Sequence, residues 1–473
     1  MSITIQNKIK SDKILSIISE KFPNSEIYVV GGYVRDCLMN KDSHDRDLIV
    51  INEDAKVFTQ RLEQIFDSTF ISLDEENRIY RLVLKDSKDI HNPDMIDVTN
   101  PIEGSLERDL MRRDLTINAI AANIHTGEII DMFGGITDIK NKTINYIEES
   151  NFIDDPLRLL RVYRFQAVLD FELGTDTIIA ICKHTDLISK PAKERVLYEL
   201  MKLFNGKYTA TALLNMNKTW LLEEIFPVVK EMKQVPPNSH HHLDLLHHVI
   251  ETVNQIQLLY EQADDKVKEH LNRCDFGGFP RLAHIKLAGF LHDIGKFSTW
   301  TIEKDTGRHR FIKHDDVGSK MVKPILKELT CSNKQIEYVS EMIKNHIYPS
   351  AMMREDSNEK TMMRYLRKIG DNVVDNIILA KADRLSARGE VITDEIVEQN
   401  LANLDRLQNF YFASLDKLTP LPKLLSGNDV MKLLNIKPSP KLGEILNALY
   451  EAQLDGDVTT KQEAIEFVKR FSN

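Results

Sequence analysis

The spacing of the apolar residues changes once along this chain, and that change limits the folds open to it. Up to about residue 147, short apolar runs such as "IYVVGG", "RDLIVI" and "RIYRLVL" are separated by turn residues, which is typical of strands in a mixed α/β module. From about residue 151 onward, the apolar residues recur at helical spacing, as in "DPLRLLRVYRFQAVL" and "AKERVLYELMKLF". The sequence therefore predicts an α+β protein in which a mixed α/β part precedes a mostly helical part.

The length of the chain predicts several domains. At 473 residues, the chain exceeds the size at which a single hydrophobic core stops growing. Paired prolines and polar residues in "KQVPPNSHHH" interrupt the helical pattern and indicate a linker. We expect four parts, namely a mixed α/β head at residues 1–148, a helical neck at 149–232, a helical domain at 240–400 and a helical tail at 401–473.

The composition excludes several classes of protein. The chain is 42% hydrophobic and 28% charged, as expected for a globular protein. It has no run of eighteen apolar residues and no signal-peptide core, so we expect a cytoplasmic protein without membrane contact. A net charge of −10 argues against indiscriminate nucleic-acid binding but is compatible with a local basic groove. The four cysteines include no CxxC pair and are expected to be reduced.

The stretch "YVVGGYVRDCLMNKDSHDRDLIV" combines two glycines with two closely spaced carboxylates. Side chains at i and i+2 of a strand point the same way, so Asp45 and Asp47 should project together from the start of a strand. Paired carboxylates are oxygen ligands suited to Mg²⁺. Gly31 and Gly32 permit a turn whose N–H groups can approach phosphates, and a helix should follow. The stretch predicts a site for Mg²⁺-dependent phosphoryl or nucleotidyl transfer.

A second stretch, "LERDLMRRDLTINAIA", makes this interpretation stronger, because glycine pairs and DxD triplets are by themselves common. It places Arg112, Arg113 and Asp114 directly before a predicted apolar helix. An arginine doublet at that position can bind a triphosphate, or it can be the solvated end of a helix.

Five stretches together resemble, in order and approximate spacing, the class II tRNA nucleotidyltransferases, which include the CCA-adding enzymes and bacterial poly(A) polymerases. They cover about the first half of the chain. They are "GGYVRD" with "DRD", "RRDLTINAIA", "DMFGGITDIKN", "DDPLRLLRVYRF" and "AKERVLYEL". The resemblance implies an enzyme that uses Mg²⁺ to add C nucleotides, A nucleotides or both to the 3′ end of tRNA. CTP and ATP would be the donors, and pyrophosphate would be released.

The resemblance also implies roles for individual residues. Asp45 and Asp47 would be catalytic, because the family uses this pair to hold the metals. Asp155 and Arg158 would read the Watson–Crick edge of the incoming base from one helix face, although an isolated i,i+3 pair is more often a plain ion pair. The expected nucleotide-binding residues are Gly31, Gly32, Arg35, Arg113, Asp155, Arg158, Arg161 and Arg164. Arg195 would brace the neighbouring helix.

One loop departs from the family pattern. Members that add the complete CCA end carry a longer flexible segment before the helix at "SLERDL", whereas here only "NPIEG" intervenes. In the family, loss of that segment accompanies partial activity, most often the addition of C residues alone. Enzymes that add only A remain an alternative, so the terminal nucleotide specificity stays open.

The helical part carries a second set of chemically active residues. The stretches "HHHLDLLHHVIETV", "LAGFLHDIGK", "IKHDDVGSK", "IKNHIYPS" and "ILAKADRLSARG" put histidines and aspartates on consecutive predicted helices, where they can converge on a metal. The joint pattern resembles the HD superfamily of metal-dependent phosphohydrolases. We therefore expect residues 240–400 to be an HD domain, while the run His240–His242 reads as a polar linker.

The resemblance implies a set of metal ligands in this domain. The primary ligands are expected to be His248, His292, Asp293 and Asp383. His248 is preferred over His247 because it leaves the apolar residues of "VIETV" for the core. His314 and His346 would hold a second metal or contact phosphate, and Lys296 could also meet phosphate. Mixed nitrogen and oxygen ligation suits Mn²⁺, Ni²⁺, Fe²⁺ or Co²⁺ and leaves the metal open.

Two alternatives to tRNA nucleotidyl transfer are considered. A poly(A) polymerase would share the chemistry, but the strongly basic C-terminal extension common in those enzymes is absent from this sequence. An HD phosphohydrolase could keep its transferase half only as an RNA-binding platform. The intact set of Asp45, Asp47, Asp155 and Arg158 argues against that second alternative.

Overall fold

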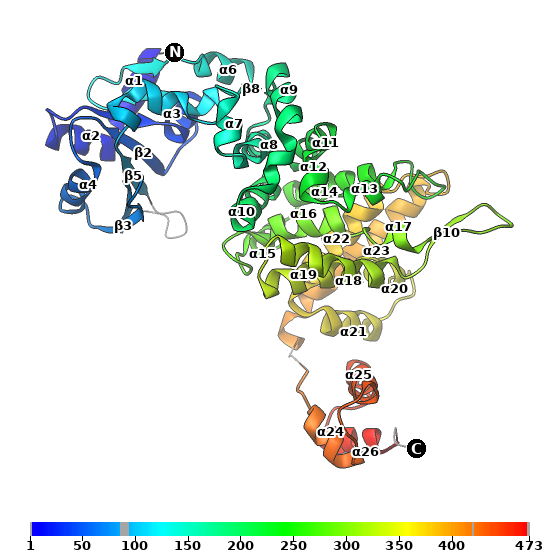
Figure 1. Cartoon of the computed structure of the whole chain (residues 1–473). Coiled ribbons are helices and arrows are strands. Elements are labelled where there is room, and N and C mark those ends of the chain that lie inside the picture. Colours follow the sequence, from blue (N-terminus) through cyan, green and yellow to red (C-terminus); the bar gives the residue numbers. More distant parts are fainter. Residues whose placement is uncertain (1, 86–93, 419–420, 471–473) are drawn as a thin grey trace. The chain divides into compact units, whose positions relative to one another are not determined.

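The computed structural model describes residues 2–85, 94–418 and 421–470 and divides into two compact units. Unit 1 is Met1–Pro227 and unit 2 is Val228–Asn473. The first unit contains the strands of a large sheet, and the second is built mainly from helices (Figure 1). The predicted α+β class is therefore confirmed.

A seven-stranded sheet in the order β3-β4-β5-β2-β1-β6-β7 forms the centre of the head. Its strands are β1 (Ile27–Val30), β2 (Asp45–Val50), β3 (Ser68–Asp74), β4 (Ile79–Leu84), β5 (Met95–Thr99), β6 (Ile120–Asn123) and β7 (Ile129–Asp131). Neighbouring strands are antiparallel except for β2 and β5, which run parallel with Asp47 opposite Asp97. The parallel pair lies in the middle of the sheet.

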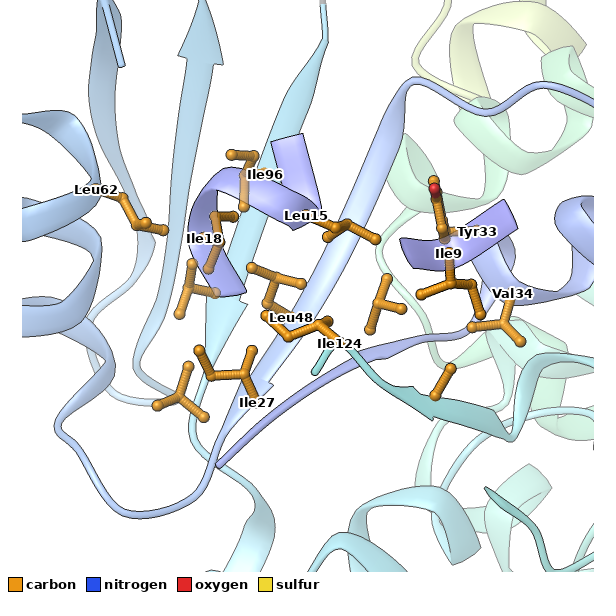
Figure 2. Close-up of a cluster of buried hydrophobic side chains, with 14 of the residues drawn as sticks. Ile9, Leu15, Ile18, Ile27, Tyr33, Val34, Leu48, Leu62, Ile96 and Ile124 are labelled. Atoms are coloured by element: carbon orange, nitrogen blue, oxygen red, sulfur yellow. The ribbon is translucent and has the colours of Figure 1, made fainter. Parts of the chain in front are cut away.

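One face of the sheet carries the main core of the head. Apolar side chains of the helices, including Ile9, Leu15 and Ile18, pack there against strand residues such as Leu48 and Ile96 (Figure 2). The helices of the head are α1 (Ser2–Ser11), α2 (Lys13–Lys21), α3 (Gly32–Leu38), α4 (Ala55–Glu63), α5 (Leu106–Met111) and α6 (Gly135–Asn141). Because strand side chains alternate, the residues next to Leu48 and Ile96 point to the opposite face.

The segment after the arginine doublet is not the helix that the sequence predicted. The helix there, α5, ends before the doublet, and Thr116–Asn118 forms a single 3₁₀ turn, η2, that leads into β6. The prediction of a helix from the apolar spacing was wrong because β6 lies inside the sheet and its residues Ile120, Ala121 and Ala122 are all buried. A short continuous apolar run of this kind fits a buried strand as well as a helix.

The neck completes unit 1 with helices that pack around α8. Its elements are α7 (Ser150–Asp154), α8 (Leu157–Leu169), α9 (Thr175–His184), the 3₁₀ helix η3 (Thr185–Ser189), α10 (Lys193–Phe204), α11 (Thr209–Lys218), α12 (Leu221–Ile225) and the small parallel pair β8 (Thr143–Ile144) and β9 (Glu172–Leu173). Both α10 and α11 pack against α8. This packing brings the polar face of α10 toward the same side as the arginines of α8, as the contacts below describe.

Unit 2 is a helical bundle with one β-hairpin and a helical tail. Every residue of α16 is buried, and α14 and α19 pack against it. The larger helices are α14 (Leu245–Gln262), α15 (Asp265–Asn272), α16 (Arg281–Leu291), α18 (His314–Glu328), α19 (Asn333–Asn345), α21 (Glu359–Ile369), α22 (Val373–Ser386) and α23 (Asp394–Ala413). The shorter ones are α13 (Val229–Met232), α17 (Lys296–Thr299) and α20 (Tyr348–Met352), the hairpin is β10 (Trp300–Ile302) with β11 (His309–Phe311), and the tail is α24 (Gly427–Leu434), α25 (Pro440–Leu454) and α26 (Lys461–Arg470). None of the described helices is both long and apolar enough to span a membrane.

Candidate functional site

Three carboxylates meet on the face of the head sheet opposite the main core. One oxygen each from Asp45, Asp47 and Asp97 can be chosen so that all three lie within 4.8 Å of one another. Asp45 and Asp47 share a face of β2, as their spacing predicted. Asp97 joins them because β5 pairs in parallel with β2 and sets Asp97 beside Asp47.

The electrostatics of this cluster favour a cation. Burial raises the pKa of Asp47, the Arg113 guanidinium opposes the rise, and the carboxylates of Asp45 and Asp97 add to it, so that the pKa reaches about 6. Burial and the Asp97 carboxylate also raise the pKa of Asp45. Three oxygen donors that repel one another are the ligand type that Mg²⁺ prefers. The residues therefore fit the expected metal.

Arg81 fixes the third carboxylate. Its Nε and Nη2 atoms each donate a hydrogen bond of 2.7 Å to an oxygen of Asp97. Such a two-point contact orients the planar carboxylate as well as binding it. Neither Arg81 nor Asp97 belongs to the predicted site.

A cavity of about 760 Å³ is lined by two of these carboxylates, Asp45 and Asp47, and its size is within the usual range for small-molecule sites. Every residue predicted for the transferase site lines it, from both the head and the neck. They are Gly31, Gly32, Arg35, Asp45, Asp47, Arg113, Asp155, Arg158, Arg161 and Arg164. The structure thus brings together residues that are far apart in the sequence.

Gly31 contributes to the cavity by having no side chain, and its N–H group is not available to a ligand. Its φ is +71°, and a Cβ atom there would lie 2.8 Å from Nη1 of Arg113 and 3.4 Å from Oδ2 of Asp47. Its N–H group donates to the carbonyl of Ile120, so this amide does not take the phosphate-binding part that the sequence suggested for it. A side chain at this position would press on both groups, which explains the glycine.

Asp155 and Arg158 do not share a helix, contrary to the prediction. Asp155 follows α7, and α8 begins only after Pro156, a residue suited to the start of a helix. The Asp155 carboxylate accepts a 2.9 Å hydrogen bond from Arg195, and Arg158 donates to the backbone carbonyl of Asn151 at 3.1 Å. Both side chains nevertheless line the same cavity. Arg195 also lines it, although the sequence assigned it only a bracing role.

The remaining arginines are held by buried acids. Arg161 lies 2.7 Å from Asp114 and 3.4 Å from Glu199, and Arg164 lies 2.8 Å from Glu199. Burial would raise the pKa of Asp114, but Arg161 and a hydrogen bond from Asn118 lower it to about 2. Asp114 therefore stays ionised, and the contacts with Asp114 and Glu199 hold the two guanidinium groups at the cavity wall.

The second cluster lies in unit 2 and joins four residues from three parts of the chain. His248 comes from α14, His292 and Asp293 follow α16, and Asp383 comes from α22. The Nε2 atom of His248 lies 3.3 Å from Asp293 and 3.2 Å from Asp383, and that of His292 lies 3.2 Å from Asp293. All four expected ligands therefore converge.

The two further histidines reach the other side of the same aspartate. The Nε2 atoms of His314 and His346 lie 3.2 Å and 3.7 Å from Oδ1 of Asp293, and 3.3 Å from each other. Asp293 thus offers one oxygen to each group of histidines. This arrangement can hold one metal or two, with Asp293 as the shared ligand.

The orientation of these histidines suits metal binding. The Nδ1 atoms of His292, His314 and His346 lie 2.6–2.8 Å from backbone carbonyls, so each donates its Nδ1 proton and leaves Nε2 as the ligand atom. Among the described residues, Nε2 of His292 and both oxygens of Asp293 are buried without a well-aligned hydrogen-bond partner. Buried polar atoms in that state require a further partner, and a metal ion fits.

Sequence reasoning missed His241 at this site. His241 lies 3.2 Å from Nζ of Lys296, which in turn lies 2.6 Å from Asp293. Both line a cavity of about 320 Å³ together with Arg308 of the β10–β11 hairpin. His247, the competing choice for the ligand, is exposed and contacts Asp244 instead. A run of three adjacent histidines carries no signal that separates the middle one.

Three protein-family models match the chain. They are the Poly A polymerase head domain at residues 27–145, the probable RNA and SrmB-binding site of polymerase A at residues 170–233 and the HD domain at residues 245–388. The first two lie within or close to unit 1, and the third lies in unit 2.

Two relatives match nearly the whole chain. An A-adding tRNA nucleotidyltransferase of Deinococcus radiodurans is 30% identical over 94% of this chain and 95% of its own. A CC-adding tRNA nucleotidyltransferase of Thermus thermophilus is 29% identical over 94% and 93% of the two chains.

The fold also matches a solved structure. The Bacillus stearothermophilus CCA-adding enzyme in complex with CTP has a TM-score of 0.59 at 20% identity, over 98% of this chain and 97% of that one. At this identity, the likeness establishes the fold.

Proposed function

The chain belongs to the tRNA nucleotidyltransferase family, and we propose on this premise that the cavity in unit 1 is its transferase site and adds C residues to the tRNA 3′ end. The protein is an enzyme that adds nucleotides from CTP or ATP to the 3′ end of tRNA and carries an HD domain. The exact nucleotides and the residues that act are the parts that we propose.

One observation carries the assignment of the site. The Asp45 and Asp47 carboxylates line the same cavity as Asp155 and Arg158, and Asp97 lies beside Asp47 on the neighbouring strand. Metal-binding oxygens and a pair of base-edge partners are therefore available to one bound nucleotide. An acceptor and a donor presented by protein can select a base without a template strand.

The residues around the cavity divide the work of binding. Mg²⁺ held by the three carboxylates would activate the 3′-hydroxyl of the tRNA and stabilise the leaving pyrophosphate. Arg113, Arg161 and Arg164 are placed to contact the triphosphate, since guanidinium groups match phosphate oxygens. Gly31 leaves the room in which Arg113 and Asp47 can approach the same ligand.

The short loop supports addition of C alone. Residues 100–104 contain only one 3₁₀ turn, η1 (Ile102–Gly104), and Ser105 then caps α5 by accepting a hydrogen bond from the backbone of Arg108. A connection of this length cannot rearrange far. In the family, loss of the longer segment accompanies partial activity, most often C addition, and the curated relatives include both a CC-adding and an A-adding enzyme.

The HD cluster supports a second activity in unit 2. Four histidines and two aspartates can hold one or two divalent transition metals, and metal-activated water would then attack a phosphate ester. Lys296 and Arg308 line the same cavity and supply positive charge for a phosphate group. A phosphorylated or damaged RNA end is the substrate class that this suits.

The transferase assignment is tested with three tRNA transcripts, ending at the discriminator base, at C and at CC. Each is incubated with Mg²⁺ and either labelled CTP or labelled ATP. We expect CTP to extend the first two transcripts only, and ATP to extend none. The variants Asp45→Ala and Asp47→Ala should each abolish extension.

Other outcomes have distinct meanings. Extension of only the CC transcript, and only by ATP, would show that the enzyme adds A and not C. Long A tracts on any RNA would favour a poly(A) polymerase, and a wild-type protein that extends no transcript would contradict the transferase assignment altogether.

A further inference from the structure

We propose that Tyr198 and Lys202 of α10 bind the tRNA primer, with the Tyr198 ring stacked on the 3′-terminal base and Lys202 beside the terminal phosphate. We call this pair the primer platform. The inference rests on the proposed transferase function and names the part of the site that holds the second substrate.

Tyr198 lies on the face of α10 that lines the cavity, and Lys202 continues this face one turn further along the helix. Arg195, Tyr198 and Lys202 are at positions i, i+3 and i+7, so they share one side of the helix. Arg195 donates to Asp155 at the base-reading end. Tyr198 lines the same cavity as Arg195 and Asp155. Seven residues of helix cover about 10 Å.

The two aromatic rings that line the cavity differ in their exposure to solvent. Phe165 is buried, and the guanidinium carbon of Arg164 lies 3.7 Å from its ring centroid. Tyr198 is 52% exposed, and Nζ of Lys202 lies 4.4 Å from its ring centroid. Phe165 therefore supports an arginine of the wall, whereas Tyr198 presents ring surface to a molecule that enters from solvent.

The geometry of the reaction places the primer end at this ring. The 3′-hydroxyl must reach Asp45 and Asp47 while the incoming base lies at Asp155 and Arg158. The last base of the primer must then lie beside the incoming base, between those two groups. Tyr198 occupies the corresponding position on α10, one turn beyond Arg195 and one turn before Lys202.

A ring is also the right kind of contact for this substrate. The last base changes as the end grows, from the discriminator base to C, so a contact with one base edge would fail after the first step. Stacking on an aromatic face tolerates every base, and an adjacent cation holds the phosphate. Edge recognition at Asp155 and Arg158 remains reserved for the incoming nucleotide.

The test compares Tyr198→Ala with Tyr198→Phe, which keeps the ring and removes the hydroxyl. We expect Tyr198→Ala to raise KM for tRNA about tenfold or more without changing KM for CTP. Tyr198→Phe should stay within about twofold of wild type for both substrates. Because the ring is half exposed, we expect both variants to fold, and thermal unfolding checks this.

A second arm uses a tRNA whose 3′-terminal nucleotide lacks its base. Anisotropy of labelled RNA measures binding without CTP, so the result does not depend on chemistry. The affinity of wild type for the abasic tRNA should fall by about the same factor as the affinity of Tyr198→Ala for the intact tRNA. The affinity of Tyr198→Ala for the abasic tRNA should be no lower than its affinity for the intact tRNA. Lys202→Gln should weaken binding of both RNAs and reduce the salt dependence.

Three results would overturn the platform. The first is a rise in KM for CTP with an unchanged KM for tRNA in Tyr198→Ala, which would place the ring in the nucleotide site. The second is a fall in the affinity of Tyr198→Ala for the abasic tRNA by the product of the two separate factors, which would mean that the ring and the base do not touch. The third is equal loss in Tyr198→Phe. Failure of the transferase assignment would instead be seen in the wild type, and the binding arm would still decide the platform.

Discussion

Asp47 is the residue at which stability and chemistry conflict. Its pKa lies at about 6 in the folded protein, against an ordinary value of 3.8. A carboxyl group whose pKa is raised by folding destabilises the folded state when it ionises, and this penalty grows as the pH rises from about 3.8 to about 6 and is complete above that value. The group is kept because ionised oxygens at this position can bind a metal.

Replacing Asp47 by asparagine should therefore stabilise the metal-free protein. The shift of about two pH units corresponds to at most about 3 kcal/mol, so Asp47→Asn should raise the thermal unfolding midpoint clearly at pH 8 and less at pH 5. Added Mg²⁺ should raise the midpoint of wild type and not that of the variant. Asp42→Asn, at an exposed position before β2, is the control. A larger gain at pH 5 than at pH 8 would contradict the raised pKa.

At the scale of residues, the sequence reveals groups whose relation is local. Asp45 and Asp47 could be predicted as a pair because period-two alternation fixes their common side. Asp97 could not, because its place depends on the register of β5 beside β2, which no local pattern encodes. His241 was missed for a similar reason, since only its contact with Lys296 distinguishes it from its neighbours.

At the scale of elements, the start of α6 lies directly against the turn η2 that follows the arginine doublet. A Cβ atom on Gly135 would lie 2.2 Å from the carbonyl oxygen of Thr116, in the turn η2. Asn118 in that turn accepts a 2.7 Å hydrogen bond from Arg35 at the cavity wall. Close approach of the two backbones therefore connects α6 to the nucleotide site.

Gly135→Ala should destabilise the head and slow transfer together. Forcing the helix away from the turn should cost about 2 kcal/mol or more, because overpacked interiors relax poorly. Gly443→Ala is the matched control, since a Cβ atom there meets nothing within 4 Å and it lies inside α25. That change should stabilise by up to about 1 kcal/mol. Unfolding in urea and the transfer rate measure both, and a neutral Gly135→Ala would refute the close approach.

Elements with a clear period or a clear stop could be predicted, and others could not. The alternating strands and the helices after residue 151 follow from the apolar pattern alone. The strand β6 could not be predicted, because burial on both faces removes the alternation. The break between Asp155 and Arg158 was visible in Pro156, but the helical spacing of the arginines concealed it.

At the scale of the whole molecule, two metal-binding sets lie in two separately packed units. Asp45, Asp47 and Asp97 belong to unit 1, and the histidine-rich cluster belongs to unit 2. The order of a mixed α/β part and a mostly helical part could be predicted, because the spacing of the apolar residues changes between them.

Asp293→Asn should remove hydrolysis without stopping nucleotide transfer. Asp293 offers one oxygen to each group of histidines, so on the proposed function its loss should reduce bound transition metal, measured by elemental analysis, and abolish metal-stimulated phosphatase activity. Transfer of labelled CTP to tRNA should stay within about twofold of wild type, since Asp293 and the transferase cavity belong to separately packed units. Asp47→Asn is the reciprocal control. Joint loss of both activities would contradict the independence of the units.

The parallel pairing of β2 with β5 also makes the carboxylate cluster depend on correct folding of the head. A slip of one residue in either strand would turn its carboxylate toward the core and carry its core residues, such as Leu48 or Ile96, to the opposite face. A misaligned head would therefore lose core packing together with its carboxylate cluster. Activity of this protein therefore requires the correct pairing of β2 with β5, and that pairing must form during folding, before any nucleotide can be added.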